Sequence, residues 1–198
     1  QGRAKRIMKT ADVIIVGSGA SGLFNALFLP QDYKVIVITK KEVEESDSFL
    51  AQGGISALKN PEDYDSYFED TMKAGHYEND KGAVEKMIKE SPQIIQNLKD
   101  FGVRFDLKDG EIEFTREGGH STFRILHHED LTGKEITSHL YEEAKKRDNI
   151  TIMENCTMID IIEKDGECKG IVYKDADGNL DTIEAPDTVL ATGGLGGL

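Results

Sequence analysis

Asp12-Val13-Ile14-Ile15-Val16-Gly17-Ser18-Gly19-Ala20-Ser21-Gly22 is the stretch from which the architecture of this chain can be predicted. Its short apolar run, residues 13–16, predicts a buried parallel strand. The run leads directly into a Gly-x-Gly-x-x-Gly pattern, and apolar residues at helical spacing follow as far as Leu29, with Pro30 ending the helix. The stretch therefore predicts a strand, a tight glycine turn and a helix.

Each glycine of the pattern has a separate physical role. Gly17 allows the tight turn, Gly19 lets the backbone approach a pyrophosphate, and Gly22 lets the helix pack closely on the strand. The phosphates would lie at the helix N-terminus, where free N–H groups and the helix dipole favour an anion. A second apolar strand over residues 34–39 stands at the right distance, so the pattern indicates dinucleotide binding. The alternative is a tight strand-to-helix turn without a ligand.

The end of the second strand bears on which dinucleotide binds. In nicotinamide-binding proteins an acidic residue commonly ends this strand and holds the ribose. Here the strand ends Thr39-Lys40-Lys41, which disfavours NAD and leaves FAD open.

Composition excludes several classes of partner. The 198 residues carry a net charge of −13, which disfavours nucleic acid and anionic membranes. Cys156 and Cys168 show no metal-ligand spacing and suit a reducing cytoplasm. No apolar run approaches the roughly 20 residues of a membrane span. We expect residues 1–7 to be a cloning remnant and Met8 to be the natural start.

The rest of the chain predicts an α/β fold: a doubly wound parallel sheet with an inserted β-meander and helical excursions between residues 61 and 146. The helix predicted at 83–99 has Asp80 as its cap and Ala83, Met87, Ile94 and Leu98 among its apolar positions. The predicted elements are helices at 61–74, 83–99 and 135–146, a hairpin at Asp109-Gly110, strands at 150–153 and 188–191, and antiparallel strands at 158–163, 170–174 and 180–184.

Two loops hold candidate functional residues. The small residues and paired glycines of 46–55 allow the backbone to lie against a flat ligand, although an ordinary surface loop fits equally well. The segment 115–121, followed by Arg124, His127 and His128, gathers ionisable groups around a glycine pair, as functional loops often do. For any single histidine or arginine there, a solvated or hydrogen-bonded surface residue is the simpler interpretation. No carboxylate or thiol stands at a persuasive spacing for a metal site with His120, His127 and His128.

These motifs together resemble the flavoprotein family that contains L-aspartate oxidase and the flavoprotein subunits of succinate dehydrogenase and fumarate reductase. The matching parts are the glycine turn, Lys40, residues 48–55 and the terminal Ala191-Thr192-Gly193-Gly194. The resemblance implies an FAD-binding, Rossmann-like domain. The cofactor-binding residues that it implies are Gly17, Ser18, Gly19, Ala20, Ser21, Gly22, Lys40, Asp47, Ser48, Phe49, Leu50, Ala51, Gln52, Gly53, Gly54, Thr192 and Gly193.

Two details indicate a branch of this family. Subunits that hold FAD covalently have a histidine where this chain has Asp47, so the resemblance implies non-covalent FAD. Residues 115–121, continuing to 124–127, are similar to the L-aspartate oxidase form of this region. That branch oxidises L-aspartate to iminoaspartate, with oxygen or fumarate as electron acceptor, in the first step of de novo NAD biosynthesis. Quinolinate synthase would take the imine onward.

The resemblance also assigns roles to charged residues. Glu117 is the candidate for substrate chemistry, because its carboxylate would attract the α-ammonium of aspartate. The family's catalytic arginine lies beyond residue 198, so neither Arg116 nor Arg124 is that residue. We therefore expect residues 8–198 to be the N-terminal part of an FAD-binding domain, without capping and C-terminal domains and inactive alone.

Two alternatives remain open from the sequence. One is a fumarate reductase or succinate dehydrogenase flavoprotein, against which Asp47 and residues 115–121 argue. The other is a nucleotide-binding module without redox chemistry, which a bound, reducible flavin would exclude.

Overall fold

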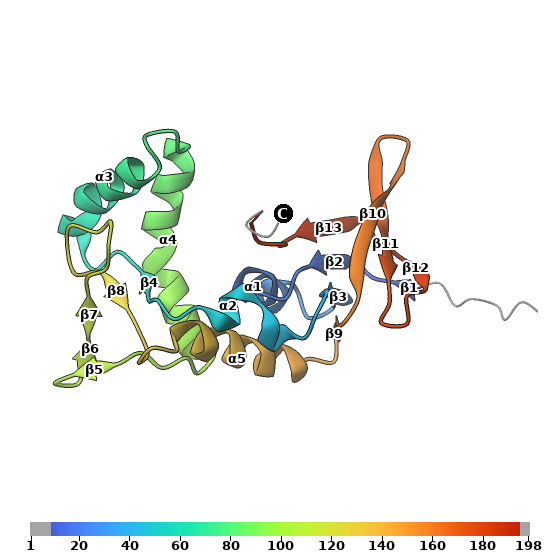
Figure 1. The fold of residues 1–198 in the computed structure, drawn as a ribbon, viewed down its shortest axis with the longest axis horizontal. Coiled ribbons are helices and arrows are strands. Elements are labelled where there is room, and N and C mark those ends of the chain that lie inside the picture. The colour runs from blue at the N-terminus through green and yellow to red at the C-terminus, as the bar shows by residue number, and fades with distance from the viewer. Residues whose placement is uncertain (1–8, 195–198) are drawn as a thin grey trace, which may run out of the picture. The chain divides into compact units, whose positions relative to one another are not determined.

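The structure is a computed structural model that describes residues 9–194 (Figure 1). The predictions for residues 1–7 and Met8 lie outside the described residues. The chain forms two compact units, of which unit 1 comprises residues 1–50 and 137–198 and unit 2 comprises residues 51–136. Each unit has its own arrangement of strands and helices.

Unit 1 contains the predicted parallel sheet. Its strand order is β13-β2-β3-β9, and every neighbouring pair is parallel (Figure 1). All residues of the two central strands are buried, which explains their uninterrupted apolar sequence. The bounds are Val13–Val16 for β2, Val35–Ile38 for β3, Ile150–Met153 for β9 and Asp187–Leu190 for β13, each within one residue of its prediction.

A β-meander packs on one face of this sheet. It consists of β10 (Thr157–Lys164), β11 (Glu167–Lys174) and β12 (Leu180–Glu184), and β1 (Lys9–Thr10) joins β12 in parallel. One hydrophobic cluster contains residues of both sheets, including Ile14 and Ile36 from the parallel sheet and Ile171 and Ile183 from the meander. The inserted meander is therefore confirmed.

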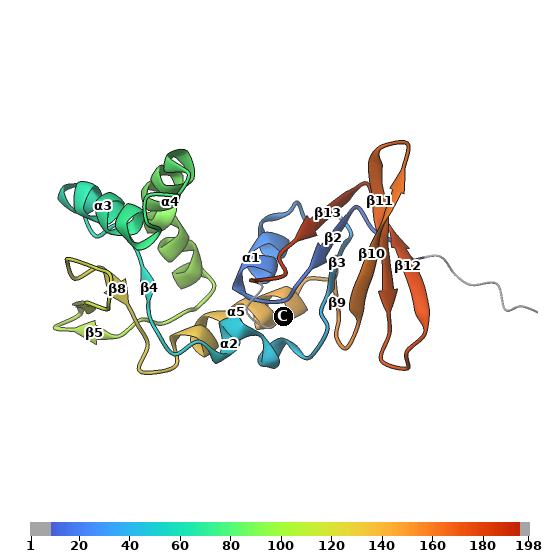
Figure 2. The same cartoon turned by 45° about the horizontal axis from the view of Figure 1, so that its top comes forward.

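The first helix covers the opposite face. α1 (Ala20–Phe28) ends at Leu29, just before Pro30, as predicted, and buries Leu23, Ala26 and Leu27. Gly22 of this helix lies against Ile15, whose side chain points away from the meander. Figure 2 shows the four parallel strands between α1 and the meander. The sheet is thus covered on both faces, in agreement with the predicted α/β class.

Three further elements flank the parallel strands in the chain. η1 (Val43–Glu45) and α2 (Asp47–Leu50) follow β3, and α5 (Thr132–Lys145) precedes β9. α5 begins three residues before its predicted start. Its residues Leu140 and Ala144 are fully buried.

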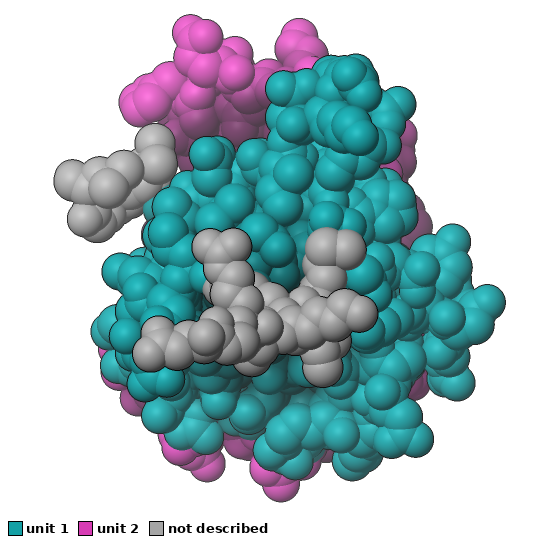
Figure 3. All heavy atoms as spheres, turned by 90° about the vertical axis from the view of Figure 1, so that its right-hand side faces the viewer, with its two compact units in different colours: residues 1–50, 137–198 teal, residues 51–136 magenta. Residues whose placement is uncertain are grey.

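Unit 2, coloured magenta in Figure 3, contains the predicted helical excursion. A 3-10 turn, η2 (Pro61–Asp63), leads into α3 (Tyr64–Ala74), and α4 (Lys81–Asp100) follows. Asp80 caps α4 as predicted, since its Oδ1 accepts from the Ala83 N–H at 2.7 Å. No helix within residues 9–194 is long and apolar enough to cross a membrane.

The apolar residues named within the predicted helix do not all lie on the buried face of α4. Ala83 and Met87 are exposed and Ile94 is half-buried, whereas Leu98 is buried as predicted. Both apolar stripes have helical spacing, so the sequence pattern did not distinguish them. The buried stripe comprises Val84, Ile88, Ser91, Ile95 and Leu98. Two of its members, Val84 and Ile88, form one cluster with Tyr67 and Met72 of α3.

Short strands complete unit 2. β4 (Ile55–Ser56), β8 (Ile125–Leu126) and β7 (Phe114–Thr115) form an antiparallel sheet in that order. β5 (Leu107–Lys108) and β6 (Glu111–Ile112) form the predicted hairpin. Its turn residues, Asp109 and Gly110, have φ values of 55° and 86°, as a two-residue turn with two positive φ angles requires.

Candidate functional site

The strand order of unit 1 creates a switch point at β2. β3 pairs with one edge of β2, and β13, which comes last in the described chain, pairs with the other. In open parallel sheets, ligands bind beyond the carboxyl ends of the strands at such a point. Gly17 follows β2, and Ala191 follows β13. The topology therefore places the glycine turn and the 191–194 segment at the same edge.

The turn at Gly17 has no room for a side chain. Its φ is +115°, and a Cβ there would lie 2.1 Å from the Ala191 carbonyl oxygen. A Cβ on Gly22 would lie 2.0 Å from the Gly17 carbonyl oxygen. A Cβ on Gly19 would instead meet the Ser48 Oγ at 2.9 Å. The structure thus brings the glycine turn together with Ser48 and Ala191, all within unit 1.

The N-terminus of α1 has the features of an anion site. Its cap residue, Gly19, has no side chain to satisfy the first N–H groups, and the first turn carries no acidic residue. The Ser18 hydroxyl is buried and has no hydrogen-bond partner among the described residues. An unsatisfied buried hydroxyl is costly, and a phosphate oxygen at this position would accept a hydrogen bond from it. These residues fit the pyrophosphate of a dinucleotide.

Most of the other predicted residues of unit 1 follow β3 or β13 in the chain, and several of them are exposed. Lys40 is exposed directly after the buried Thr39, and Asp47 is exposed at the start of α2. Leu50 is 64% exposed. Gly193 has a φ of +75°. Of the remaining predicted residues, Ser21 and Thr192 are exposed, whereas Ala20, Ser48 and Phe49 are half-buried.

The Ala51–Gly54 loop belongs to unit 2. The Gly54 N–H donates to Glu117 Oε1 at 2.9 Å, and the Ala51 carbonyl accepts from the Gly133 N–H at 3.0 Å. A Cβ on Gly54 would lie 2.3 Å from Ile125 Cγ2, so only glycine fits at that position. The structure therefore joins Glu117, predicted for substrate chemistry, to the loop predicted to line the flavin. No local pattern in the sequence predicts this contact.

A family model described as an FAD binding domain matches residues 12–198. The chain belongs to this family. Its membership confirms the predicted FAD cofactor, and the uncapped helix N-terminus and the Ser18 hydroxyl fit that cofactor's pyrophosphate.

Curated relatives of this FAD binding domain include two clostridial proteins. The L-aspartate oxidase of Clostridium perfringens is 43% identical over 190 residues, which cover 96% of this chain and 43% of the relative. The L-aspartate oxidase of Clostridium acetobutylicum is 44% identical over 188 residues, which cover 94% and 43%. The chain thus spans less than half the length of these relatives.

Solved structures confirm the fold. The E. coli quinol fumarate reductase flavoprotein superposes with a TM-score of 0.89 at 28% identity, covering 96% of this chain and 34% of that chain. The Sdh1 complex of Mycobacterium smegmatis gives a TM-score of 0.85 at 30% identity, covering 96% and 35%. The α/β FAD-binding fold predicted from the sequence is therefore confirmed.

Arg124 of this FAD binding domain is a buried structural residue. Its guanidinium is 0% exposed, donates to both carboxylate oxygens of Asp63 at 2.7 and 2.8 Å, and contacts Asp70 at 2.6 Å. The hydrogen bonds from Arg124 hold the pKa of Asp63 well below its usual range. A solvated or hydrogen-bonded surface residue, the simpler interpretation of the sequence, is wrong for Arg124 in its surface position, because the hydrogen-bonded side chain is buried. Neither aspartate was predicted from the sequence, because they lie 61 and 54 residues before Arg124 with no local signal.

The three histidines of this region do not converge. His120 Nδ1 lies 3.0 Å from Arg124 Nη1, whereas His127 Nδ1 and His128 Nδ1 each lie 3.1 Å from one oxygen of Asp106. Within residues 9–194, no group of three or more histidine, cysteine, aspartate or glutamate side chains could hold a metal ion.

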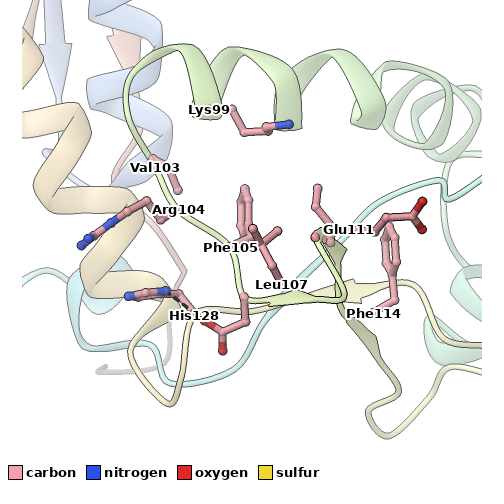
Figure 4. Close-up of a pocket in the computed structure, with 11 residues that line it drawn as sticks. Lys99, Val103, Arg104, Phe105, Leu107, Glu111, Phe114 and His128 are labelled. Carbon is pink, nitrogen blue, oxygen red and sulfur yellow. Dashed lines mark ion pairs between the residues drawn. The ribbon is translucent and has the colours of Figure 1, made fainter.

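An open cavity of about 850 Å³ lies elsewhere in unit 2, between the end of α4 and the β5–β6 hairpin (Figure 4). Its buried lining is apolar, with Val103 and Phe105, and its edge carries Lys99, Arg104 and His128. None of the residues predicted to bind FAD lines it.

Proposed function

We propose that the protein carrying this domain is an FAD-dependent L-aspartate oxidase. It oxidises L-aspartate to iminoaspartate, and oxygen or fumarate accepts the electrons. The observation that carries the proposal is the Glu117–Gly54 contact, because it puts a carboxylate against the loop expected to line the flavin. The 43–44% identity to clostridial L-aspartate oxidases supports the same substrate.

The residues proposed to hold FAD are those predicted from the sequence. Gly17–Gly22 and the N-terminus of α1 would bind the pyrophosphate, and the Ser18 hydroxyl would donate a hydrogen bond to it. Lys40 would lie near the adenosine, residues 47–54 would line the flavin, and Thr192 and Gly193 would approach it from the end of β13. Bound FAD supplies the redox chemistry, by accepting a hydride from the substrate. A carboxylate at Asp47, in place of a histidine, supports non-covalent binding.

Glu117 would select an amino acid over a plain dicarboxylate. Its side chain is exposed, and its Oε2 makes no hydrogen bond to any described residue. A carboxylate in this position attracts the α-ammonium of aspartate, which succinate and fumarate lack. Glu117 is therefore our candidate for substrate recognition.

The proposed reaction also implies a biosynthetic role for the protein. We propose that it performs the first step of de novo NAD biosynthesis and that quinolinate synthase consumes its imine product. We also propose a cytoplasmic location, which the two free cysteines, Cys156 and Cys168, support.

A second candidate is a fumarate reductase or succinate dehydrogenase flavoprotein. The TM-score of 0.89 to the E. coli quinol fumarate reductase flavoprotein favours it. Asp47 and the sequence of residues 115–121 favour the oxidase instead.

The test uses the purified full-length protein in air-free buffer. We expect yellow protein, flavin released into the filtrate after denaturation, and loss of visible flavin absorbance on adding L-aspartate but not succinate. Flavin that stays with the precipitate, or bleaching by succinate alone, would point to the second candidate. If the purified protein carried no flavin and took up none when FAD was added, both enzymes would be excluded. Glu117→Gln should reduce L-aspartate oxidation more than fumarate reduction, whereas equal losses would remove Glu117 from substrate recognition.

A further inference from the structure

The Ala51–Gly54 loop is tied down at its two ends by groups far away in the sequence. At one end the Ala51 carbonyl accepts from the Gly133 N–H at 3.0 Å, next to the start of α5. At the other end the Gly54 N–H donates to Glu117 Oε1 at 2.9 Å. Between these ties Gln52 and Gly53 are exposed, and neither N–H has a backbone or side-chain acceptor among the described residues. The loop therefore presents two free donors from a fixed frame.

The Glu117 carboxylate itself comes from an anchored segment. The His120 N–H donates to the Glu117 carbonyl at 3.2 Å and closes a turn. The next residue, Ser121, donates its N–H and its hydroxyl to Asp70 at 2.7 and 2.8 Å. Asp70 is in turn held by the buried Arg124. A chain of contacts thus leads from the interior of unit 2 to Glu117 and from there to Gly54.

The two oxygens of Glu117 are in different positions. Oε1 accepts the Gly54 N–H, whereas Oε2 lies 3.5 Å from the point that a Cβ on Gly53 would occupy and has no hydrogen-bond partner in the described chain. A carboxylate that accepts a backbone N–H makes a charge-assisted bond, which is stronger than a neutral one.

We propose that Glu117 is a positioning residue for the Ala51–Gly54 loop, in addition to its role toward the substrate. Oε1 holds the Gly54 amide and so sets the position of the Gln52 and Gly53 donors, and Oε2 stays available for a ligand ammonium. This inference rests on the proposed function, because it takes the loop to be the one that lines the flavin. It separates two properties of one side chain: an acceptor atom for the loop and a negative charge for the substrate.

Three variants distinguish these properties. Glu117→Gln keeps an oxygen at the same reach but loses the charge. Glu117→Asp keeps the charge, but its shorter side chain loses the reach to Gly54. Glu117→Ala loses both. Glu111→Gln is the matched control, because Glu111 is an exposed glutamate of unit 2 on β6 with no contact to the loop.

The first measurement is amide hydrogen exchange at Gly54 in the full-length protein without FAD. We expect exchange to be about tenfold faster in the Ala and Asp variants, and less than about threefold faster in the Gln variant and in Glu111→Gln. Exchange at Ile125 and Leu126 should stay unchanged, which shows that the β4-β8-β7 sheet is intact. If the Gln variant exchanged as fast as the Ala variant, or the Ala variant as slowly as the wild type, the proposal would be overturned.

The second measurement is FAD affinity, followed by the quenching of FAD fluorescence. We expect FAD to bind about tenfold more weakly to the Ala and Asp variants and less than about threefold more weakly to the Gln variant. Equal affinity in all four variants would contradict the positioning role. These results are independent of catalysis: a wild-type protein that binds FAD but does not oxidise L-aspartate would contradict the proposed function and leave the loop contact to be judged by exchange and affinity.

Discussion

Arg124 Nη2 lies 2.7 Å from Asp63 Oδ1, and the two side chains are only 0% and 8% exposed. A buried ion pair of this kind contributes little against a well-packed apolar alternative, but it is costly to break, because the remaining partner is an uncompensated charge. The pair is therefore a constraint on unit 2: Arg124 cannot be lost without leaving Asp63 and Asp70 unsatisfied. Because Asp70, the second carboxylate that Arg124 contacts, also holds Ser121, Arg124 supports the segment that carries Glu117.

The first prediction concerns the removal of this guanidinium. Arg124→Met should lower the free energy of unfolding by about 3–5 kcal/mol, because it leaves buried carboxylates without their partner. Urea denaturation followed by circular dichroism measures the effect. Arg116→Met is the control, since Arg116 is exposed and lies over the Phe123 ring, and it should change stability by less than about 0.5 kcal/mol. Equal effects of the two substitutions would contradict the structural role of Arg124.

The second prediction concerns pH. Hydrogen bonds from Arg124 lower the pKa of Asp63, and for Asp70 the hydrogen bonds from Ser121 and Arg124 outweigh burial, so that its pKa is also lowered. The unfolded chain therefore binds protons more readily than the folded one. The stability that the two carboxylates contribute is present above about pH 4 and is lost as the pH falls below it.

Acid titration of the unfolding free energy checks this prediction. Asp63→Asn should be less stable than the wild type at neutral pH, and its stability should fall less steeply between about pH 4 and pH 2. A pH dependence that is parallel in the variant and the wild type would show that Asp63 is not the group that titrates.

The third prediction concerns the glycine turn. Gly17→Ala should abolish FAD binding and lower the unfolding free energy by at least about 2 kcal/mol, because alanine at φ +115° is strained and its Cβ would collide with the Ala191 carbonyl. Gly178→Ala separates the two causes, since Gly178 has a φ of +84° but open space around it. We expect that control to cost about 1 kcal/mol and to leave FAD affinity unchanged. If both variants bound FAD normally, the turn would not be part of the cofactor site.

The sequence predicted what depends on local pattern. The βαβ unit around Gly17, the hairpin turn at Asp109-Gly110 and the Asp80 cap all follow from local sequence signals. The contacts that build the site of unit 2 are different, because Glu117 and Gly54 are 63 residues apart and Arg124 and Asp63 are 61 apart. No periodicity or turn signal encodes which distant carboxylate contacts which amide or guanidinium, so these pairs could be identified only from the structure.

The fourth prediction concerns the Ser18 hydroxyl, which is buried and without a hydrogen-bond partner in the described residues. Ser18→Ala removes an unsatisfied polar group, so the protein without FAD should become more stable by about 1 kcal/mol. The same change removes a donor to the pyrophosphate, so FAD should bind about fivefold more weakly. Thermal unfolding without FAD and a fluorescence titration with FAD measure the two effects. Ser21→Ala is the control, because Ser21 is exposed in the first turn of α1 and its loss should not stabilise the protein. A Ser18→Ala variant that is less stable without FAD and binds it normally would show that the hydroxyl has a structural partner and no role at the cofactor.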